Sequence, residues 1–219
     1  TQISDHISAI IIDNVLSITP FDNYFGDESI TLSVSDEELA DSETFTITIN
    51  AINDAPVLET VSDVSFDEDA SGSISVSGSD IDGDDLSYSI TEGTDITASL
   101  DGSDVSFSAP LDFNGSETFT VSVTDDELSD SQSITVTILP VNDAPVATAD
   151  LSGVTNEDQS IVVNLSGSDI DGDIIEFGLD TNTNNGDVFI NGSIATYIPA
   201  QDFNGSDSFI FSVSDGEFT

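Results

Sequence analysis

Residues 117–139 read ETFTVSVTDDELSDSQSITVTIL, and this stretch decides the fold. Apolar residues alternate with Thr and Ser on both sides of an acidic turn, which runs from Asp125 to Asp130. The alternating apolar residues are Phe119, Val121 and Val123 before the turn and Ile134, Val136 and Ile138 after it. A period of two on either side of a turn is typical of an antiparallel hairpin with one buried face.

The elements around this hairpin recur along the chain, after about ninety residues, which indicates a tandem repeat. The sequence NDAPV occurs at 53–57 and 142–146, DIDGD at 80–84 and 169–173, DFNGS at 112–116 and 202–206, and the hairpin start at 33–36, 122–125 and 212–215. The repeats predict three domains: the C-terminal part of a repeat over 1–53, a complete repeat over 54–142, and over 143–219 a repeat without its last strand.

The complete repeat predicts an all-β fold. Short apolar runs between turn signals indicate about seven strands, at 57–66, 72–77, 86–90, 96–100, 104–108, 117–124 and 131–139. This size and strand number fit tandem antiparallel β-sandwiches of the immunoglobulin or cadherin kind, without a Cys-Trp-Cys core. We find no convincing helix in the pattern.

The charge of the chain is one-sided, with 44 acidic residues, no Lys or Arg, and a formal net charge of -44. Such a field excludes nucleic acid and anionic lipid as electrostatic partners, and it favours metal cations. The chain has no Cys for disulfides, no apolar run long enough to span a bilayer, and no basic leader at its start. We therefore expect an extracellular or surface protein held together by its cores and by metal, with no membrane insertion in this segment.

Strand direction predicts where the acidic loops lie, because consecutive strands reverse direction. The loops at 80–85 and 125–130 should lie at the same end of the complete repeat as the linker Asn53-Asp54. The loops at 67–69 and 112–117 should lie at the other end, beside the linker Asn142-Asp143. Acidic elements from two neighbouring repeats would then meet at each junction.

These elements resemble the bacterial cadherin-like tandem repeats of large surface adhesins, over nearly the whole chain. In cadherins the junction binds calcium, so the resemblance implies a ligand set for each junction here. For the later junction the matching residues are Glu68, Asp112, Asn114, Asn142, Asp143, Asp169, Asp171 and Asp215. For the earlier junction they are Asn53, Asp54, Asp80, Asp82 and Asp125, and the DIDGD loops add Asp84 and Asp173.

The sequence departs from the cadherin pattern in two places. The linker lacks one Asn, and Ala51 and Pro140 stand where its first Asp would be. At the earlier junction Asn23 stands at the position that corresponds to the aspartate Asp112, with Asp22 beside it. The number of ions at each junction is therefore left open.

Calcium also suits the residues without the resemblance, because Ca²⁺ takes six to eight oxygen ligands from carboxylates, amides and carbonyls in flexible loops. With no Cys and only His6, zinc and copper sites are not expected. The DIDGD loop is not an EF-hand, because Gly83 is at its fourth position and Thr91 stands at the twelfth. An acidic Asp-Gly turn without a metal remains the alternative for any single loop.

No nucleophile elbow, phosphate loop or histidine relay is present, so we expect no enzyme and regard His6 as a solvated strand residue. The predicted function is a calcium-stiffened structural spacer of an extracellular adhesin or surface fibre. Alternatively, the repeats bind directly, either to one another or to polysaccharide. The apolar residues of the two end pieces, Phe209, Phe211 and Val213 together with 10–12, should lack part of their cover, which neighbouring copies in a fibre or further sequence could supply.

Overall fold

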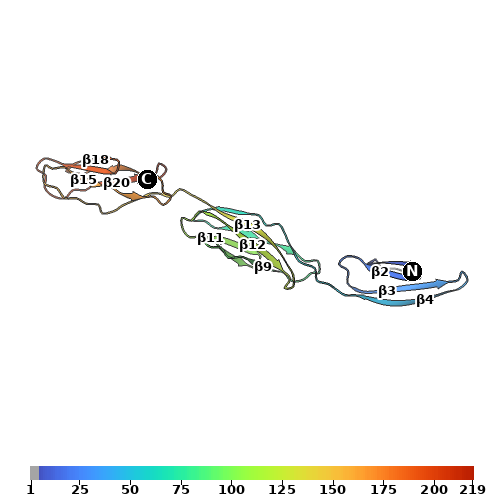
Figure 1. The fold of residues 1–219 in the computed structure, drawn as a ribbon. Helices are drawn as coiled ribbons and strands as arrows, with labels where there is room; N and C mark the ends of the chain where they lie inside the picture. Colours follow the sequence, from blue (N-terminus) through green and yellow to red (C-terminus); the bar gives the residue numbers. More distant parts are fainter. Residues whose placement is uncertain (1–4) are drawn as a thin grey trace. The chain divides into compact units, whose positions relative to one another are not determined.

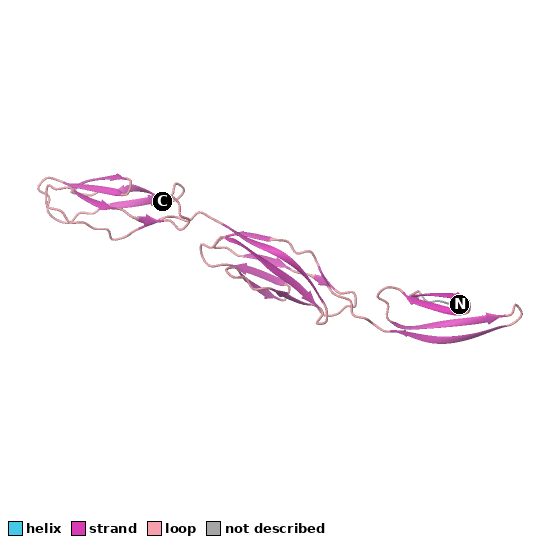
Figure 2. Cartoon of the chain, in the orientation of Figure 1, coloured by secondary structure: helices cyan, strands magenta, loops and turns pink. Residues whose placement is uncertain are grey.

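The computed structural model describes residues 5–219, and within this range the chain consists of strands and loops without a helix (Figure 2). No helix in these residues could therefore cross a membrane. The chain divides into two compact units: the first runs to Pro110 and resumes over Gly115–Ile138, and the second comprises Leu111–Asn114 and Leu139–Thr219. The all-β prediction is confirmed, and the predicted domain borders stay predictions.

The first repeat contributes two antiparallel hairpins, each formed by neighbouring strands. Ile30 is fully buried, whereas Ile10, Ile11 and Ile12 are more than half exposed. The strands are β1 (Ile7–Ile12), β2 (Val15–Pro20), β3 (Gly26–Ser35) and β4 (Ala40–Ile49).

The second repeat is a sandwich of two antiparallel sheets (Figure 1). One sheet has the order β10-β11-β7, the other has the order β6-β13-β12-β9, and β5 pairs with β8. Its strands are β5 (Val57–Leu58), β6 (Val64–Asp67), β7 (Gly72–Ser75), β8 (Gly78–Ser79), β9 (Ser87–Ile90), β10 (Thr97–Asp101), β11 (Asp104–Ser108), β12 (Gly115–Thr124) and β13 (Ser129–Leu139).

The core of this repeat follows from the alternation in β12 and β13, which pair along their whole length with Phe119 opposite Ile134. Successive side chains point to opposite faces, so the apolar set of both strands turns inward together. Across the sandwich the rings of Phe107 and Phe119 meet edge to face, with centroids 5.5 Å apart. The inward residues of β12 and β13 are all buried: Phe119, Val121, Val123, Ile134, Val136 and Ile138.

The first strand of the repeat differs from the prediction, because the run at 57–66 is not one strand. It forms β5, which pairs with β8, and β6, which joins the sheet of β13. Between β5 and β6 the backbone is hydrogen-bonded to the side chain of Gln132 and not to another strand. Gln132 donates to the carbonyls of Leu58 and Glu59 at 2.9 and 3.1 Å, and it accepts a hydrogen bond from the amide of Val61 at 3.0 Å. These bonds satisfy the backbone where the chain crosses from one sheet to the other.

The third repeat has the same plan with shorter sheets, in the orders β15-β19-β18, β14-β16 and β17-β20. Its described strands are β14 (Val146–Ala147), β15 (Ile161–Asn164), β16 (Gly167–Ser168), β17 (Glu176–Thr181), β18 (Gly186–Asn191), β19 (Ile194–Pro199) and β20 (Ile210–Ser214). Its buried core is Leu165, Val188 and Ala195, with Val213 also buried. Residues 148–160, which correspond to the β6 region, form no strand.

One pair of contacting positions carries a large and a small residue in both repeats, but in the opposite order. In the second repeat Gly72 lies against Val64 and the ring of Phe66, and a methyl group at Gly72 would overlap both. In the third repeat Ile161 takes the place of Gly72 and Gly153 that of Val64, and Ile161 lies 2.6 Å from where a side chain at Gly153 would begin. Each repeat therefore has one large and one small residue at this contact.

Candidate cation-binding site

The linker before the second repeat is tied to two loops of that repeat. The Asn53 side-chain amide donates to Asp125 at 2.9 Å, and the backbone amide of Asp54 donates to the carboxylate of Asp82 at 2.8 Å. The loop before β9 and the turn between β12 and β13 therefore lie at the linker end of the repeat, as strand direction predicted.

Asp80 organises the DIDGD loop. Its Oδ1 accepts the backbone amides of Asp82, Gly83 and Asp84 at 2.8, 3.1 and 3.4 Å, and Gly83 has a φ of 82°, a conformation that glycine adopts readily. Its Oδ2 is buried and has no hydrogen-bond partner among the described residues. Oxygens of the three aspartates lie within 4.8 Å of one another.

The third repeat reproduces the tie between linker and loops. The Asn142 side chain donates to Asp215 at 2.9 Å, and the backbone amide of Asp143 donates to Asp171 at 2.8 Å. The same pairs of positions thus bond in both repeats with the same lengths, although each repeat has its own core.

The third repeat also reproduces the DIDGD loop around Asp169. Its Oδ1 accepts the amides of Asp171 and Asp173 at 3.0 and 3.3 Å, and its Oδ2 is buried without a partner in the described part of the chain. Buried carboxylate oxygens are normally hydrogen-bonded, so an unpaired one at the same place in two repeats calls for an explanation.

The electrostatics of the cluster differ from one carboxylate to the next. Hydrogen bonds lower the pKa of Asp125, first from the backbone amide of Leu128 and then from Asn53. The pKa of Asp84 is raised by desolvation and then by the negative charges of its neighbours, first Asp80. The end of the repeat therefore combines one carboxylate whose ionised form is stabilised by hydrogen bonds, Asp125, with one that is crowded by like charge, Asp84.

The remaining predicted residues belong to the end of the second repeat that carries β6 and the start of β12. Glu68 follows β6 and is 6% exposed. Asp112 has a φ of 56°, and the exposed Asn114 stands directly before β12. Their approach to the later linker stays a prediction. In the first unit Asn23 borders the same open hollow as Asp80.

Two polar anchors were not recognised in the sequence. Asp130 was assigned to a turn, yet it accepts the backbone amide of Leu58 at 2.9 Å. Glu117 was placed at the border between the loop at 112–117 and the strand at 117–124; it lies within β12 and accepts the amides of Thr94 and Asp95 at 2.9 and 2.8 Å. An acidic residue at the matching position of each repeat was the available signal: Glu28, Glu117 and Asp207.

His6 is exposed, as predicted, but it does not lie in a strand. It precedes β1, its Nδ1 lies 2.8 Å from Oε1 of Glu28, and its ring stacks on that of Tyr24 with centroids 4.5 Å apart. It belongs to the polar contacts of the first repeat.

The cluster of Asp80, Asp82 and Asp84 suits a hard cation, because its carboxylate oxygens lie close together and one of them is a buried acceptor that lacks a donor; the loop of Asp169 has the same buried acceptor. Carboxylates accept hydrogen bonds and do not donate them when ionised, so they cannot satisfy one another. Asp80 and Asp169 are the residues placed to hold such an ion, with Asp82 and Asp171 beside them.

Strand order and the repeated linker geometry define the class: tandem β-sandwich repeats of immunoglobulin-like fold. The chain belongs to the Bacterial Ig domain family, whose pattern matches residues 53–137 and 142–219. The sequence interpretation as a bacterial cadherin-like or Ig-like tandem repeat is thereby confirmed. A search of curated proteins finds no relative of this chain.

Two solved protocadherin structures support the fold. The EC1-2 fragment of human protocadherin-24 is similar with a TM-score of 0.52 and 16% identity, over 76% of this chain and 90% of that fragment. Mouse protocadherin-24 EC1-3 gives a TM-score of 0.51 and 15% identity, over 90% of this chain and 74% of that one. The endo-fucoidan hydrolase MfFcnA4, of glycoside hydrolase family 107, gives a TM-score of 0.34 and 16% identity over the whole of this chain, which spans 36% of that protein's length.

Proposed function

We propose that this chain is a segment of a non-catalytic spacer in an extracellular adhesin or surface fibre, and that calcium stiffens its junctions. The observation that carries the proposal is the pair of buried, unpartnered carboxylate oxygens on Asp80 and Asp169. They occupy equivalent places in two repeats, within equivalent hydrogen-bond patterns. A bound cation, which accepts electron density from oxygen, would satisfy both of these oxygens.

Calcium fits these places better than other ions. The surrounding groups are oxygens on loops of adjustable shape, and Ca²⁺ accepts such ligands in irregular numbers, whereas Mg²⁺ demands near-ideal octahedral geometry. Carboxylates this close repel one another, and a divalent cation among them converts that repulsion into attraction.

The chain's own residues explain why an ion here would act on the junction. Asp82 accepts a hydrogen bond from the backbone amide of Asp54, and Asp125 accepts one from the side chain of Asn53. The loops that would bind the ion are therefore also bonded to the linker. An ion that fixes the position of Asp82 would restrict the backbone at Asp54 as well. The same argument applies to Asp171 and Asp143.

The remaining ligands of the later junction are proposed to come from the end of the second repeat. Glu68, Asp112 and Asn114 match the family's junction residues and supply oxygen atoms of the required type. With ligands from both repeats, an ion would limit the hinge at the linker. Each further ion would also reduce the self-repulsion of a chain with a net charge of -44.

Calorimetry with and without calcium tests the proposal. A ligand that binds only the folded state at a hundredfold excess over its Kd adds about 2.7 kcal/mol, and extracellular sites have a Kd of about 10⁻⁴ to 10⁻³ M. We therefore expect the melting temperature to rise in millimolar calcium and to fall on chelation. Magnesium at equal concentration is the control for ionic strength. If both ions raise the melting temperature equally, or if neither changes it, the assignment to calcium is refuted.

A second candidate function is homophilic binding by the repeats, and one observation favours it. Although the chain is strongly acidic, the outward side chains along β12 and β13 are hydroxyl groups, so two copies could approach there with little charge repulsion. Sedimentation equilibrium in calcium would distinguish this function, because a spacer alone stays monomeric. The facing pairs are Thr118 with Thr135, Thr120 with Ser133 and Ser122 with Ser131.

A further inference from the structure

The third repeat carries an apolar patch on the outward face of the sheet β15-β19-β18. Val162 and Phe189 are the partners of Thr196 on the two neighbouring strands. Ile194 and Ile198 lie two residues before and after Thr196 on β19, and therefore on the same face. The patch consists of these four apolar side chains around Thr196, and each of the four is 45–61% exposed: Val162, Phe189, Ile194 and Ile198.

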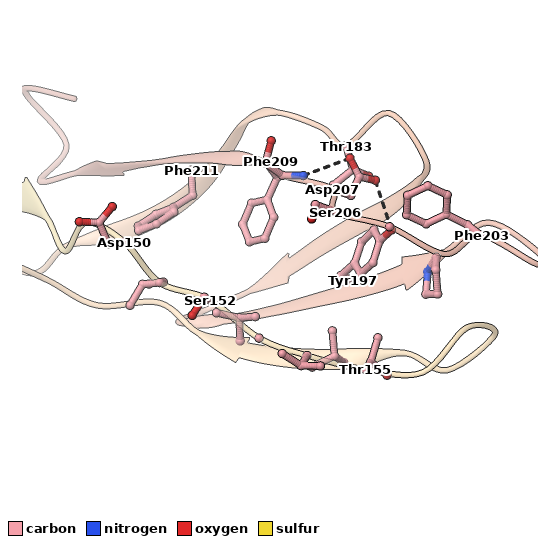
Figure 3. A pocket seen from close by; sticks show the side chains of 18 of the residues that line it. Asp150, Ser152, Thr155, Thr183, Tyr197, Phe203, Ser206, Asp207, Phe209 and Phe211 are labelled. Atoms are coloured by element: carbon pink, nitrogen blue, oxygen red, sulfur yellow. Dashed lines mark hydrogen bonds between the residues drawn. The ribbon is translucent and has the colours of Figure 1, made fainter.

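The patch is separate from the core of the repeat, because the residues that alternate with its members face inward. Val188 and Ala195 are at most 5% exposed. Tyr197 also points to the inner side, where its hydroxyl donates to Asp207 at 3.2 Å (Figure 3). The outward apolar residues are therefore additional to those that the sandwich buries.

The matching face of the second repeat, in the sheet β10-β11-β7, is polar throughout. The row that corresponds to 162, 196 and 189 consists of three exposed serines, at 73, 106 and 99. Asp104 and Ser108 stand at the positions of Ile194 and Ile198. The fold itself thus requires no apolar residue on this face. In the second repeat β13 belongs to the opposite sheet and leaves the face open, so the patch does not depend on the last strand of a repeat.

The patch is nearly uncharged, although the chain is strongly acidic. Its three strands contain one acidic residue, Asp187, which pairs with Ile198 at one end of the face. The charges that would attract a basic protein are therefore concentrated elsewhere on the repeat and do not select this face. A polyanion or a second copy of the chain would bring further negative charge, which disfavours both as partners.

The dimensions of the patch suit a small or narrow ligand. Three strands about 4.8 Å apart and five residues of β19 at about 3.4 Å each give a surface of roughly 10 by 14 Å. A stable protein interface buries about 800 Å² on each partner, which is several times this area. A protein partner would therefore have to extend well beyond the patch, whereas a single oligosaccharide strand would not.

Hydrogen-bonding groups lie among the apolar side chains. Asn164 and Asn191 are on the same face, one on each side of Ile194. Each amide offers both donors and an acceptor, and the hydroxyl of Thr196 offers both at the centre of the patch. Sugars present C–H surfaces that pack on an aromatic ring and hydroxyl groups that both donate and accept. Phe189 provides the exposed ring that such a site requires.

We propose that this patch binds an extended, uncharged polysaccharide of the cellulose type. Such a polysaccharide is a flat ribbon with C–H surfaces on its two faces and hydroxyl groups along its edges, so it fits an open sheet surface. One face of the ribbon packs on Phe189 and the aliphatic side chains, and hydroxyl groups at its edges bond to Asn164 and Asn191. This binding is an activity beyond that of a spacer, and the patch shares no residue with the aspartate loops.

Cellohexaose is the probe, added to the whole 219-residue chain in calcium. Maltohexaose is the matched control ligand, because it contains the same number of glucose units in a curved, starch-type chain. Titration followed by amide NMR shifts should show one cellohexaose per chain, with the shift changes confined to β15, β18 and β19. We expect maltohexaose to bind at least about tenfold more weakly.

Two exposed aromatic residues give a matched pair of variants. Phe189→Ala removes the ring from the patch and should weaken the binding of cellohexaose at least about tenfold. Phe21→Ala removes a ring of the first repeat that is also about half exposed, and it should leave the affinity unchanged. Val162→Asp places a charge in the patch and should weaken binding as Phe189→Ala does. If Val162→Asp fails to fold, the pair of aromatic variants still decides.

Several results would overturn the proposal. No binding of cellohexaose at millimolar concentration, or equal affinity for the two oligosaccharides, would show that no extended glycan is recognised. Equal effects of Phe189→Ala and Phe21→Ala would place the sugar outside the patch. A dimer of the free chain that Phe189→Ala dissociates would make a second copy the occupant. Retention of cytochrome c, as a basic probe protein, by the parent chain and not by Phe189→Ala would make a basic protein the occupant.

Discussion

Asp80→Asn should change the stability of the second repeat in opposite directions with and without calcium. Asn keeps an oxygen that can accept the loop amides now bound by Oδ1, so the loop retains its internal hydrogen bonds. The substitution removes one negative charge from the aspartate cluster and replaces the unpartnered Oδ2 with an amide group. Repulsion therefore decreases, and so does the capacity to hold a cation.

The magnitude follows from the distance between the carboxylates of Asp80 and Asp82, which lie within 4.8 Å of each other. At that separation two charges repel by about 1 kcal/mol in water and by about 3.5 kcal/mol at an effective dielectric of 20. Because both groups are partly exposed, the lower value applies. In chelator the variant should gain about 1 kcal/mol, which raises the melting temperature of a domain of this size by roughly 4–8 °C.

In calcium the sign reverses. If the loss of a carboxylate ligand weakens binding about tenfold, a site at a hundredfold excess of calcium loses about 1.3 kcal/mol of its stabilisation, which outweighs the gain from reduced repulsion and leaves the variant about 0.3 kcal/mol less stable than the parent. Calorimetry of both proteins, with chelator and with millimolar calcium, measures the two differences, and Glu92→Gln, an exposed charge change in another loop, is the control. A shift of the same sign in both conditions, or no difference from the control, would refute the reasoning.

Three further predictions concern other parts of the chain. Asp171→Ala should remove the calcium-dependent slowing of amide exchange in the loop of Asp169 and leave that in the loop of Asp80 unchanged, while Asp82→Ala should do the reverse. Phe119→Ala should destabilise the second repeat by about 3–5 kcal/mol in urea unfolding, whereas Phe189→Ala, at a side chain that is 61% exposed, should change stability by at most about 0.5 kcal/mol. The amides of Asp95 and then Thr94 hold the pKa of Glu117 below its usual value. Glu117 therefore contributes to the free energy of unfolding above its unfolded-state pKa, and this contribution is lost as the pH falls through its lower folded-state pKa. Urea unfolding between about pH 5 and pH 2 should therefore show a flatter acid limb for Glu117→Gln than for the parent chain.

The alternation in residues 117–139 was sufficient to predict the sheets, because a period of two fixes which side chains share a face. The hairpin of β12 and β13 forms over the predicted residues, with Phe119 opposite Ile134. The division of 57–66 into β5 and β6 could not be predicted in the same way. It depends on Gln132, a polar side chain more than seventy residues away in the sequence, which local patterns do not connect to the first strand.

The candidate site was predictable in its composition and in its repetition. Asn53, Asp54, Asp80, Asp82 and Asp125 come together within the first unit, since strand direction alone places their loops at one end. The unpartnered Oδ2 of Asp80 was not predictable, because it depends on which of two chemically equal oxygens faces the loop amides. Which carboxylates contact backbone amides is set by loop geometry that the sequence does not specify.

The exchange of large and small residues between the pair Val64 and Gly72 and the pair Gly153 and Ile161 affects how the chain can misfold. Neighbouring domains of similar sequence are prone to exchange strands during folding. If the segment with Val64 joined the third repeat, the side chain of Val64 would overlap Ile161, whereas the segment with Gly153 would leave a cavity beside Gly72. Each segment thus fits the repeat that encodes it and fits its neighbour poorly, which guides a growing array of similar domains toward pairing each strand within its own repeat.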